Sequence, residues 1–162
     1  MPQYLTAPAN SILAAGAPLI LELEVGANAT AAQMLAGKIV IHDATDGDVK
    51  EAGSKALNPL GVLMEKPDQL EATAYAVGDA CRVIVGGPCI VKLTITSTGS
   101  GSVAPGDWLA CAANGKVSKD AVGAMGGQGA RVGQALGTWT QSLTDGEILV
   151  NFKITPDARA AS

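Results

Sequence analysis

The chain has 162 residues and a formal net charge of −4, and 48% of its residues are hydrophobic while only 3% are aromatic. A length of this order fits one domain, whose core has to be built from Val, Ile, Leu and Ala. The 11 basic residues are scattered, which excludes the clustered positive surface that nucleic-acid binding requires. No apolar run is long enough to predict a membrane-spanning helix.

Residues 1–18 are expected to form an extended N-terminal arm, because no helical or strand periodicity is sustained there. A disordered terminus is one interpretation. The other is an arm that lies across a neighbouring subunit and adds a strand to it. In the second case, the candidate contact residues are the apolar positions of the arm: Tyr4, Leu5, Pro8, Ile12 and Leu13.

A single domain is expected over residues 19–155. Leu19–Val25 alternates after Ile20, which predicts a first strand with Glu22 and Glu24 facing outward. The alanine-rich residues 27–36 fit either one short helix or an irregular crossing. Further along, strands are expected at 38–42 and 60–64, an acidic turn at 42–48, and polar connections at 50–58 and 67–75.

Residues 77–93 carry the clearest pattern: a Gly-Asp turn, a β-branched strand, a Gly-Gly-Pro break at 86–88 and a second apolar strand. This pattern predicts a hairpin that turns at the break. In such a hairpin Cys81 lies too far along the ladder from Cys89 to form a disulfide. The three cysteines are therefore expected to be buried free thiols, as suits a protein made in the cytosol.

The remaining chain predicts more short strands. They are expected at residues 92–98, 108–112, 132–139 and 148–154. Asn114-Gly115 suits a tight type I′ turn, residues 123–129 form a glycine-rich loop, and residues 156–162 form a frayed tail. The Gly-acid turn of residues 78–79 recurs at 106–107 and 146–147.

The chain also carries a weak internal duplication. The Gly-Lys approach at 37–40 matches 115–117, and the Gly-led strand at 60–63 matches 132–136. Each half then ends at a Gly-acid turn followed by a strand. The sequence thus predicts an all-β, small β-barrel or β-sandwich-like domain, with two similar halves wrapped together and at most one or two short helices.

Residues suited to catalysis or metal binding are sparse. His42 is the only histidine, so a catalytic triad would have to use it with a nearby aspartate. No nucleophile context accompanies it, and a surface or capping role is the interpretation adopted. The Asp-rich run at 43–48 fails the spacing of a helix-loop-helix calcium site, and the cysteines are too far apart for a zinc site. No catalytic, cofactor-binding or metal-binding residue is predicted.

The glycine-rich loop and the few aromatic residues exclude two further classes of site. The Gly-Gly-Gln-Gly run at 126–129 fits neither phosphate-binding glycine pattern, and a surface or subunit-contact loop is the plain interpretation. Sugar platforms and single-strand nucleic-acid grooves depend on exposed aromatic residues. With five aromatic residues in the chain, neither is expected.

Taken in order, several short motifs resemble one known pattern. They are Ala-Gly-Lys-Ile-Val (36–40), Asn-Pro-Leu-Gly-Val-Leu (58–63), Tyr-Ala-Val-Gly-Asp (75–79), Arg-Val-Ile-Val-Gly-Gly (82–87), Val-Ala-Pro-Gly-Asp-Trp-Leu (103–109), Asn-Gly-Lys-Val (114–117), Val-Gly-Gln-Ala-Leu (132–136) and Gly-Glu-Ile-Leu-Val (146–150). In this order the chain resembles the phage-type capsid decoration proteins, also called head-stabilising or cement proteins.

That resemblance implies a barrel-like domain that assembles as a homotrimer on the exterior of an icosahedral virion after synthesis in the host cytoplasm. The implied partners are the major capsid protein and neighbouring decoration subunits, with no nucleic acid and no membrane. The family supplies no catalytic residue. The loop at 123–129 is an insertion relative to the pattern. Deleting residues 1–16 is then expected to weaken capsid attachment and to leave the barrel folded.

Two other functions remain open from the sequence. One is a tail or baseplate β-module, or a carbohydrate-binding β-module, which would need a patch of aromatic residues. The other is a small β-barrel hydrolase centred on His42.

Overall fold

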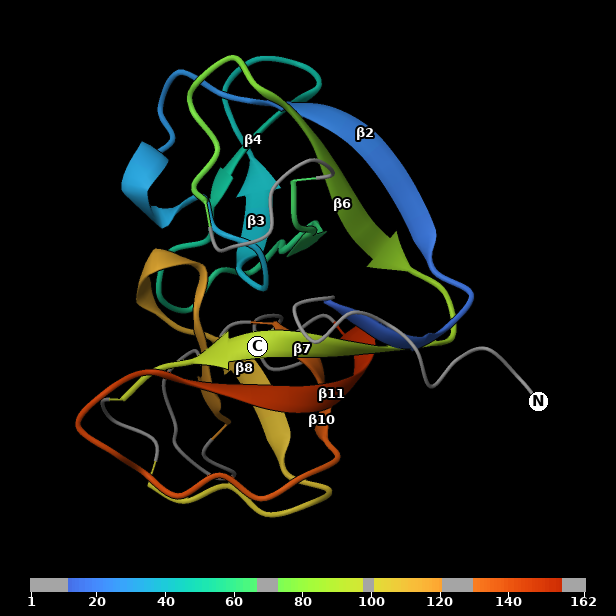
Figure 1. Ribbon diagram of the computed structural model, residues 1–162, viewed down its shortest axis with the longest axis vertical. Helices are drawn as coiled ribbons and strands as arrows, with labels where there is room; N and C mark the ends of the chain where they lie inside the picture. Colours follow the sequence, from blue (N-terminus) through green and yellow to red (C-terminus); the bar gives the residue numbers. More distant parts are fainter. Residues whose placement is uncertain (1–11, 67–72, 98–100, 121–129, 156–162) are drawn as a thin grey trace, which may run out of the picture.

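The computed structural model describes residues 12–66, 73–97, 101–120 and 130–155, and within them it is almost entirely β (Figure 1). The strands are β1 (Leu13–Gly16), β2 (Leu19–Val25), β3 (Ile39–His42), β4 (Asp48–Glu51), β5 (Gly61–Leu63), β6 (Ala80–Gly86), β7 (Cys89–Ile95), β8 (Trp108–Cys111), β9 (Val117–Lys119), β10 (Arg131–Ala135) and β11 (Gly146–Thr155). The helical segments are the single turns η2 (Ala31–Gln33) and η3 (Ala113–Gly115). Within the described residues, no helix is long and apolar enough to cross a membrane.

The strands close into two small barrels, one above the other in Figure 1. The first barrel has the strand order β2-β4-β3-β5-β6. The second barrel runs β7-β9-β8-β10-β11, and a pairing between β7 and β9 completes it. In addition, β1 pairs with the first half of β7, along the edge of β7 that β9 joins at its end. The prediction of an all-β, barrel-like fold is confirmed.

The two barrels repeat one topology. Taken in chain order, β2 to β6 correspond to β7 to β11: the first and third strands of each set are parallel, and every other neighbouring pair is antiparallel. The predicted duplication is therefore present. Each half closes into its own barrel, however, instead of wrapping with the other half into one.

Two glycines at equivalent places show how closely the halves agree. A Cβ on Gly61, in β5, would lie 2.1 Å from the carbonyl oxygen of Ile84, and a Cβ on Gly133, in β10, would lie 2.3 Å from that of Asn151. In each barrel a short strand thus crosses its neighbour at a distance that only glycine allows. The predicted match between the Gly-led strands at 60–63 and 132–136 is confirmed.

The first proposed match of the duplication is wrong. Gly37 corresponds to Gly106, because both have positive φ, of 82° and 91°, and lead into the second strand of their barrels. The Gly37 N–H donates to the Leu63 oxygen, and the Gly106 N–H donates to the Ala135 oxygen. The Gly-Lys pair at 115–116 instead precedes β9, which is the counterpart of β4. The sequence similarity there reflects turn-forming residues alone.

The Gly-Asp turns at Gly78-Asp79 and Gly106-Asp107 share one hydrogen-bond pattern. The Asp79 carboxylate accepts the N–H of Ala76 at 2.8 Å, and the Asp107 carboxylate accepts that of Ala104 at 2.8 Å. Both glycines have positive φ. The third predicted turn, at 146–147, is different: Gly146 has no positive φ and packs against the Trp139 side chain.

The hairpin predicted at residues 86–88 does not form. Both strands exist, but β6 belongs to the first barrel and β7 to the second, so the Gly-Gly-Pro break joins the barrels. The link from β1 to β2 runs beside it, where the Ala17 N–H donates to the Pro88 oxygen at 3.1 Å. Gly16 and Gly87, both with positive φ, allow this contact because a Cβ on either would strike the other segment.

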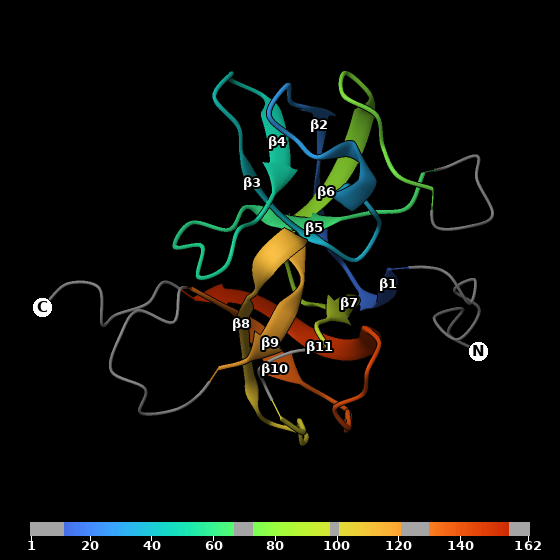
Figure 2. The same cartoon turned by 90° about the vertical axis from the view of Figure 1, so that its left-hand side faces the viewer.

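The core of the second barrel continues across the junction into the first. Figure 2 shows the two barrels stacked against each other from the side. One buried cluster joins second-barrel residues such as Leu93, Leu109 and Phe152 to Ile39 and Ile84 of the first barrel. Backbone bonds also cross the junction, among them the Gly115 N–H to the Ala52 oxygen at 2.7 Å and the Thr94 N–H to the Gly37 oxygen at 3.0 Å. The barrels therefore pack as one body.

Most strand predictions hold, with shifts at the ends. β4 is an exception, because the sequence predicted turn and polar connection over its residues. The alanine-rich stretch at 27–36 contains only the single turn η2. Asn114 and Gly115 both have positive φ, of 59° and 69°. Because β8 and β9 on either side of them pair antiparallel, the predicted tight turn is confirmed. The loop at 123–129 and the tail at 156–162 lie outside the described residues.

Candidate functional site

Of the five predicted contact residues, the structure describes two. Tyr4, Leu5 and Pro8 lie outside the described residues, and their contact role stays a prediction. Ile12 is only 5% exposed and belongs to the core of its own chain, while Leu13 opens β1 opposite Val91 and is half-buried. Ile12 therefore has almost no surface left for a neighbouring subunit.

Ile12 anchors the start of the described chain to the second barrel. Its carbonyl oxygen accepts the Lys92 N–H at 2.8 Å, and its own N–H donates to Glu65 Oε2 at 3.1 Å. Its side chain packs at Gly37, where a Cβ would lie 3.3 Å from Cδ1. The segment expected to be an arm, residues 1–18, thus contains β1, which pairs with β7. We now expect deletion of residues 1–16 to destabilise the fold.

His42 ends β3 and is exposed. The aspartate beside it has a structural role: Asp43 accepts the Asn28 backbone N–H at 3.0 Å and the Asn28 side-chain amide at 2.9 Å, and it pairs with Lys50 at 3.3 Å. The bonds from Asn28 lower the pKa of Asp43 to about 2. Gly47, with φ of 86°, makes the turn that follows. Asp43 is thus committed to holding this turn to the loop after β2.

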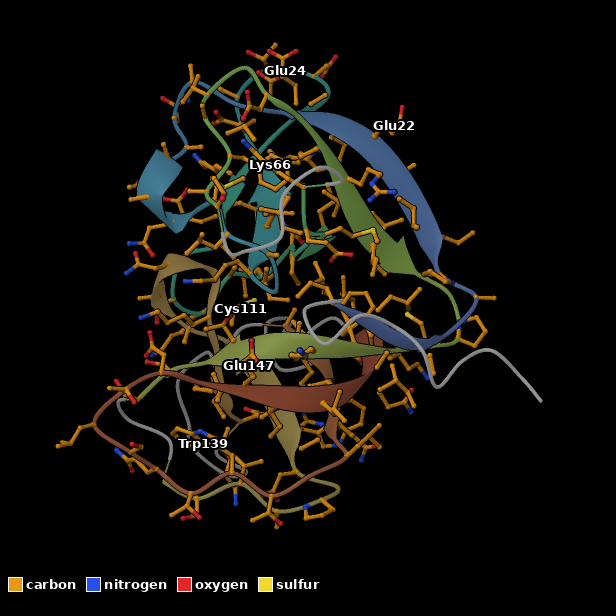
Figure 3. The ribbon with its side chains drawn as sticks, viewed as in Figure 1. Glu22, Glu24, Lys66, Cys111, Trp139 and Glu147 are labelled. Carbon is orange, nitrogen blue, oxygen red and sulfur yellow. The ribbon has the colours of Figure 1, made fainter. Side chains whose placement is uncertain are left out.

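The three cysteines are free and buried, as predicted. Burial raises the pKa of Cys81 to about 11 and that of Cys111 to about 12, and it also raises the pKa of Cys89. A thiol reacts as its thiolate, so these groups are protonated and unreactive at neutral pH. Cys111 lies near the junction between the barrels (Figure 3). Across the described residues, no group of three or more His, Cys, Asp or Glu side chains could hold a metal ion.

The aromatic side chains that the structure describes serve the core. Tyr75, Phe152 and Trp139 are 2%, 3% and 8% exposed, and the Tyr75 hydroxyl donates to the Met64 oxygen at 2.8 Å. Trp108 is half-buried beneath the Arg131 guanidinium, 5.2 Å from its ring. These four residues form no exposed aromatic platform of the kind that sugar binding uses.

An apolar surface that the sequence did not predict lies on the first half of β2. Leu19, Ile20 and Leu21 are 65%, 41% and 44% exposed. Figure 1 shows β2 on the outside of a long curved ribbon that it forms with β6. The prediction that Glu22 and Glu24 face outward is confirmed, and Figure 3 shows Glu22 pointing away from the barrel. We call residues 19–24 the β2 edge.

Sequence alone could not reveal the β2 edge, because alternation predicts that one face of the strand is buried. That inference holds only where another strand or the core lies opposite. Val25 is buried and Leu23 half-buried, whereas Leu21, on the same face, is 44% exposed. The run of three exposed aliphatic residues at the start of a strand was the available signal.

A solved structure shares this architecture. The head fiber gp8.5 N base of bacteriophage phi29 superposes with a TM-score of 0.51 and 11% sequence identity, covering 83% of this chain and 95% of that one. At this identity the likeness shows the fold alone. No curated protein matches the chain.

A family comparison reaches further. The model of a family described as XM1 gp53 minor capsid protein matches residues 7–135, which include the whole first barrel and most strands of the second. This agrees with the resemblance to phage capsid proteins noted in the sequence. The chain belongs to the XM1 gp53 minor capsid protein family and is a phage capsid-associated protein.

Proposed function

We propose that this protein is a decoration protein that binds the outer surface of the phage head as a homotrimer and stabilises the shell. The observation that carries the proposal is the match to a minor capsid family over most of the chain. The proposed partners are the major capsid protein and neighbouring copies of this chain, and the proposed location is the exterior of the virion.

The architecture suits that role. The core of the second barrel extends into the first and joins the two into one body. A symmetric trimer repeats each modest contact three times, so that weak individual contacts add up to firm attachment. Ile12, where the described chain begins, is held to the barrels through both its N–H and its carbonyl oxygen. Tyr4, Leu5 and Pro8 remain the proposed contacts of the arm with neighbouring subunits.

The chemistry of the site favours a structural role over catalysis. The buried thiols are protonated, and Asp43, the carboxylate next to His42, is engaged by Asn28 and Lys50. The carbohydrate-binding alternative would need exposed aromatic side chains, and those described are buried or half-buried. The capsid family favours the head over the tail or baseplate.

The test uses phage heads that lack this protein and the purified full-length chain. We expect the protein to co-sediment with the heads at a saturating stoichiometry of three copies per site and to raise the temperature at which the heads release DNA. Light scattering should give the mass of a trimer, in solution or on assembly. A protein that does not co-sediment, or that leaves the release temperature unchanged, would overturn the proposal.

A further inference from the structure

The duplication allows a direct comparison between β2 and β7, which are equivalent strands of seven residues. The last residue of each pairs in parallel with the short strand beside it, Val25 with β4 and Ile95 with β9. Counting back three places, Glu22 is the equivalent of Lys92. The two strands differ in what lies along the rest of that same edge.

On β7 the edge is filled by the chain's own N-terminal segment. β1 runs antiparallel to the first half of β7, with Gly16 opposite Cys89 and Leu13 opposite Val91. The Lys92 N–H donates to the Ile12 oxygen at 2.8 Å. This edge of β7 therefore has a backbone partner along its length, β1 first and β9 at the end.

On β2 the equivalent edge is open among the described residues. β4 pairs only with Glu24 and Val25. The Glu24 N–H donates to the Gly47 oxygen on that side, and alternate residues of a strand point the same way. The N–H groups of Ile20 and Glu22 therefore face the open edge, and no described strand pairs with them there. Unpaired edges of this kind bind added strands.

Side-chain burial shows the same difference. Val91 is fully buried and Cys89 is 3% exposed on β7, whereas their counterparts on β2, Leu21 and Leu19, are 44% and 65% exposed. Covering the exposed Leu19 and Leu21 side chains would be favourable, because it removes apolar surface from water. A strand placed on β2 as β1 is placed on β7 would satisfy the edge N–H groups and cover part of these leucines.

The charges on the β2 edge select the occupant. On β7, Lys92 pairs with Glu147 at 3.7 Å. On β2, neither the Glu22 nor the Glu24 side chain forms an ion pair or hydrogen bond within the described residues, and Arg82, across the ladder from Glu22, forms no ion pair with it. Two exposed, unpaired carboxylates beside aliphatic side chains fit a basic, apolar strand.

We infer that the β2 edge is a strand-acceptor site for an extended segment of the phage shell protein that carries aliphatic residues and at least one Lys or Arg. The segment lies antiparallel to β2, at the position that β1 takes on β7, with its basic side chain beside Glu22 and Glu24. This rests on the proposed function for the source of the segment. This contact, at residues 19–24, is separate from the one proposed for Tyr4, Leu5 and Pro8 of the arm.

The first experiment asks whether the edge is free in the isolated protein. We expect the amide protons of Ile20 and Glu22 to exchange rapidly in NMR hydrogen-exchange measurements, while that of Lys92 on the covered edge exchanges slowly. Slow exchange at both β2 positions would mean that this chain or a second copy already fills the edge, and it would overturn the inference.

The second experiment measures binding to heads that lack the protein. Glu22→Pro removes an N–H that points away from β6, and Leu21→Ser removes exposed apolar surface; each should weaken binding roughly fivefold or more. Glu22→Gln with Glu24→Gln should weaken binding and reduce its dependence on salt. Leu143→Ser, at a fully exposed residue on the β10–β11 connection, is the matched control and should bind as the wild type does.

The outcomes separate the two proposals. Wild-type protein that binds heads while Glu22→Pro and Leu21→Ser bind equally well overturns the strand-acceptor site and leaves the decoration role standing. Wild-type protein that does not bind heads overturns both. If Glu22→Pro does not fold, as judged by its thermal unfolding, Leu19→Lys at the 65% exposed position replaces it and must weaken binding.

Discussion

Replacing Ile12 by alanine tests whether the end of the arm is part of the fold. The side chain is 5% exposed and packs among core residues at Gly37, so the change removes buried carbon atoms and leaves a cavity. Substitutions of this type cost about 2–5 kcal/mol. For a chain of this length, 1 kcal/mol lowers Tm by roughly 2–4 °C. A cost near 3 kcal/mol predicts a fall in Tm of roughly 6–12 °C.

Thermal unfolding followed by circular dichroism or calorimetry measures this change directly. Leu143→Ala is the control, because a fully exposed side chain should change stability by less than about 0.5 kcal/mol. Removing residues 1–16 takes away β1 together with Ile12 and should also lower Tm. An Ile12→Ala protein that unfolds at the wild-type temperature would refute the assignment of Ile12 to the core.

Two further predictions concern other positions. Gly133→Ala should lower Tm by more than roughly 3 °C, because φ is +151° and a Cβ would lie 2.3 Å from the Asn151 oxygen, while Gly137→Ala, with open space around it, should not. The depressed pKa of Asp43 means that its contribution to stability is complete above the usual pKa of 3.8 and is lost as pH falls through about 2. Asp43→Asn should therefore reduce the fall in Tm over that pH range. A Tm that falls with pH as steeply as in the wild type would contradict the hydrogen bonds assigned to Asp43.

Local patterns predicted the elements well where they were strong. β2, β6 and β7 follow from β-branched, alternating residues, and the two Gly-Asp turns follow from the need for positive φ at Gly78 and Gly106. β4 was missed because Val49 is the only apolar residue among its four positions. A short strand of this kind is held by its neighbours and leaves little pattern of its own.

Pairing between strands could not be predicted from the same patterns. A turn between two apolar strands is equally compatible with a hairpin and with a crossing from one barrel to the next, and residues 86–88 make the crossing. Ile12 was assigned to a free arm because a single buried side chain in a short segment creates no periodicity. Its burial depends on β7 and Gly37, which lie far along the chain.

The exposed apolar residues of the β2 edge could not be predicted for a related reason. Sequence alternation predicted the outward acids of β2 correctly, but it could not show that Leu19 and Leu21 stay exposed on the other face. Only the comparison with β7 shows that an equivalent edge can hold a strand. In this duplicated fold, the covered edge of β7 thus identifies the partner strand that β2 lacks among the described residues.

Cryo-electron microscopy of heads assembled without this protein, before and after its addition, tests the central claim most directly. A trimeric, two-barrel density on the outer surface that appears only after addition is the predicted result. Heads that look the same in both samples, or added density confined to the interior or the tail, would contradict it.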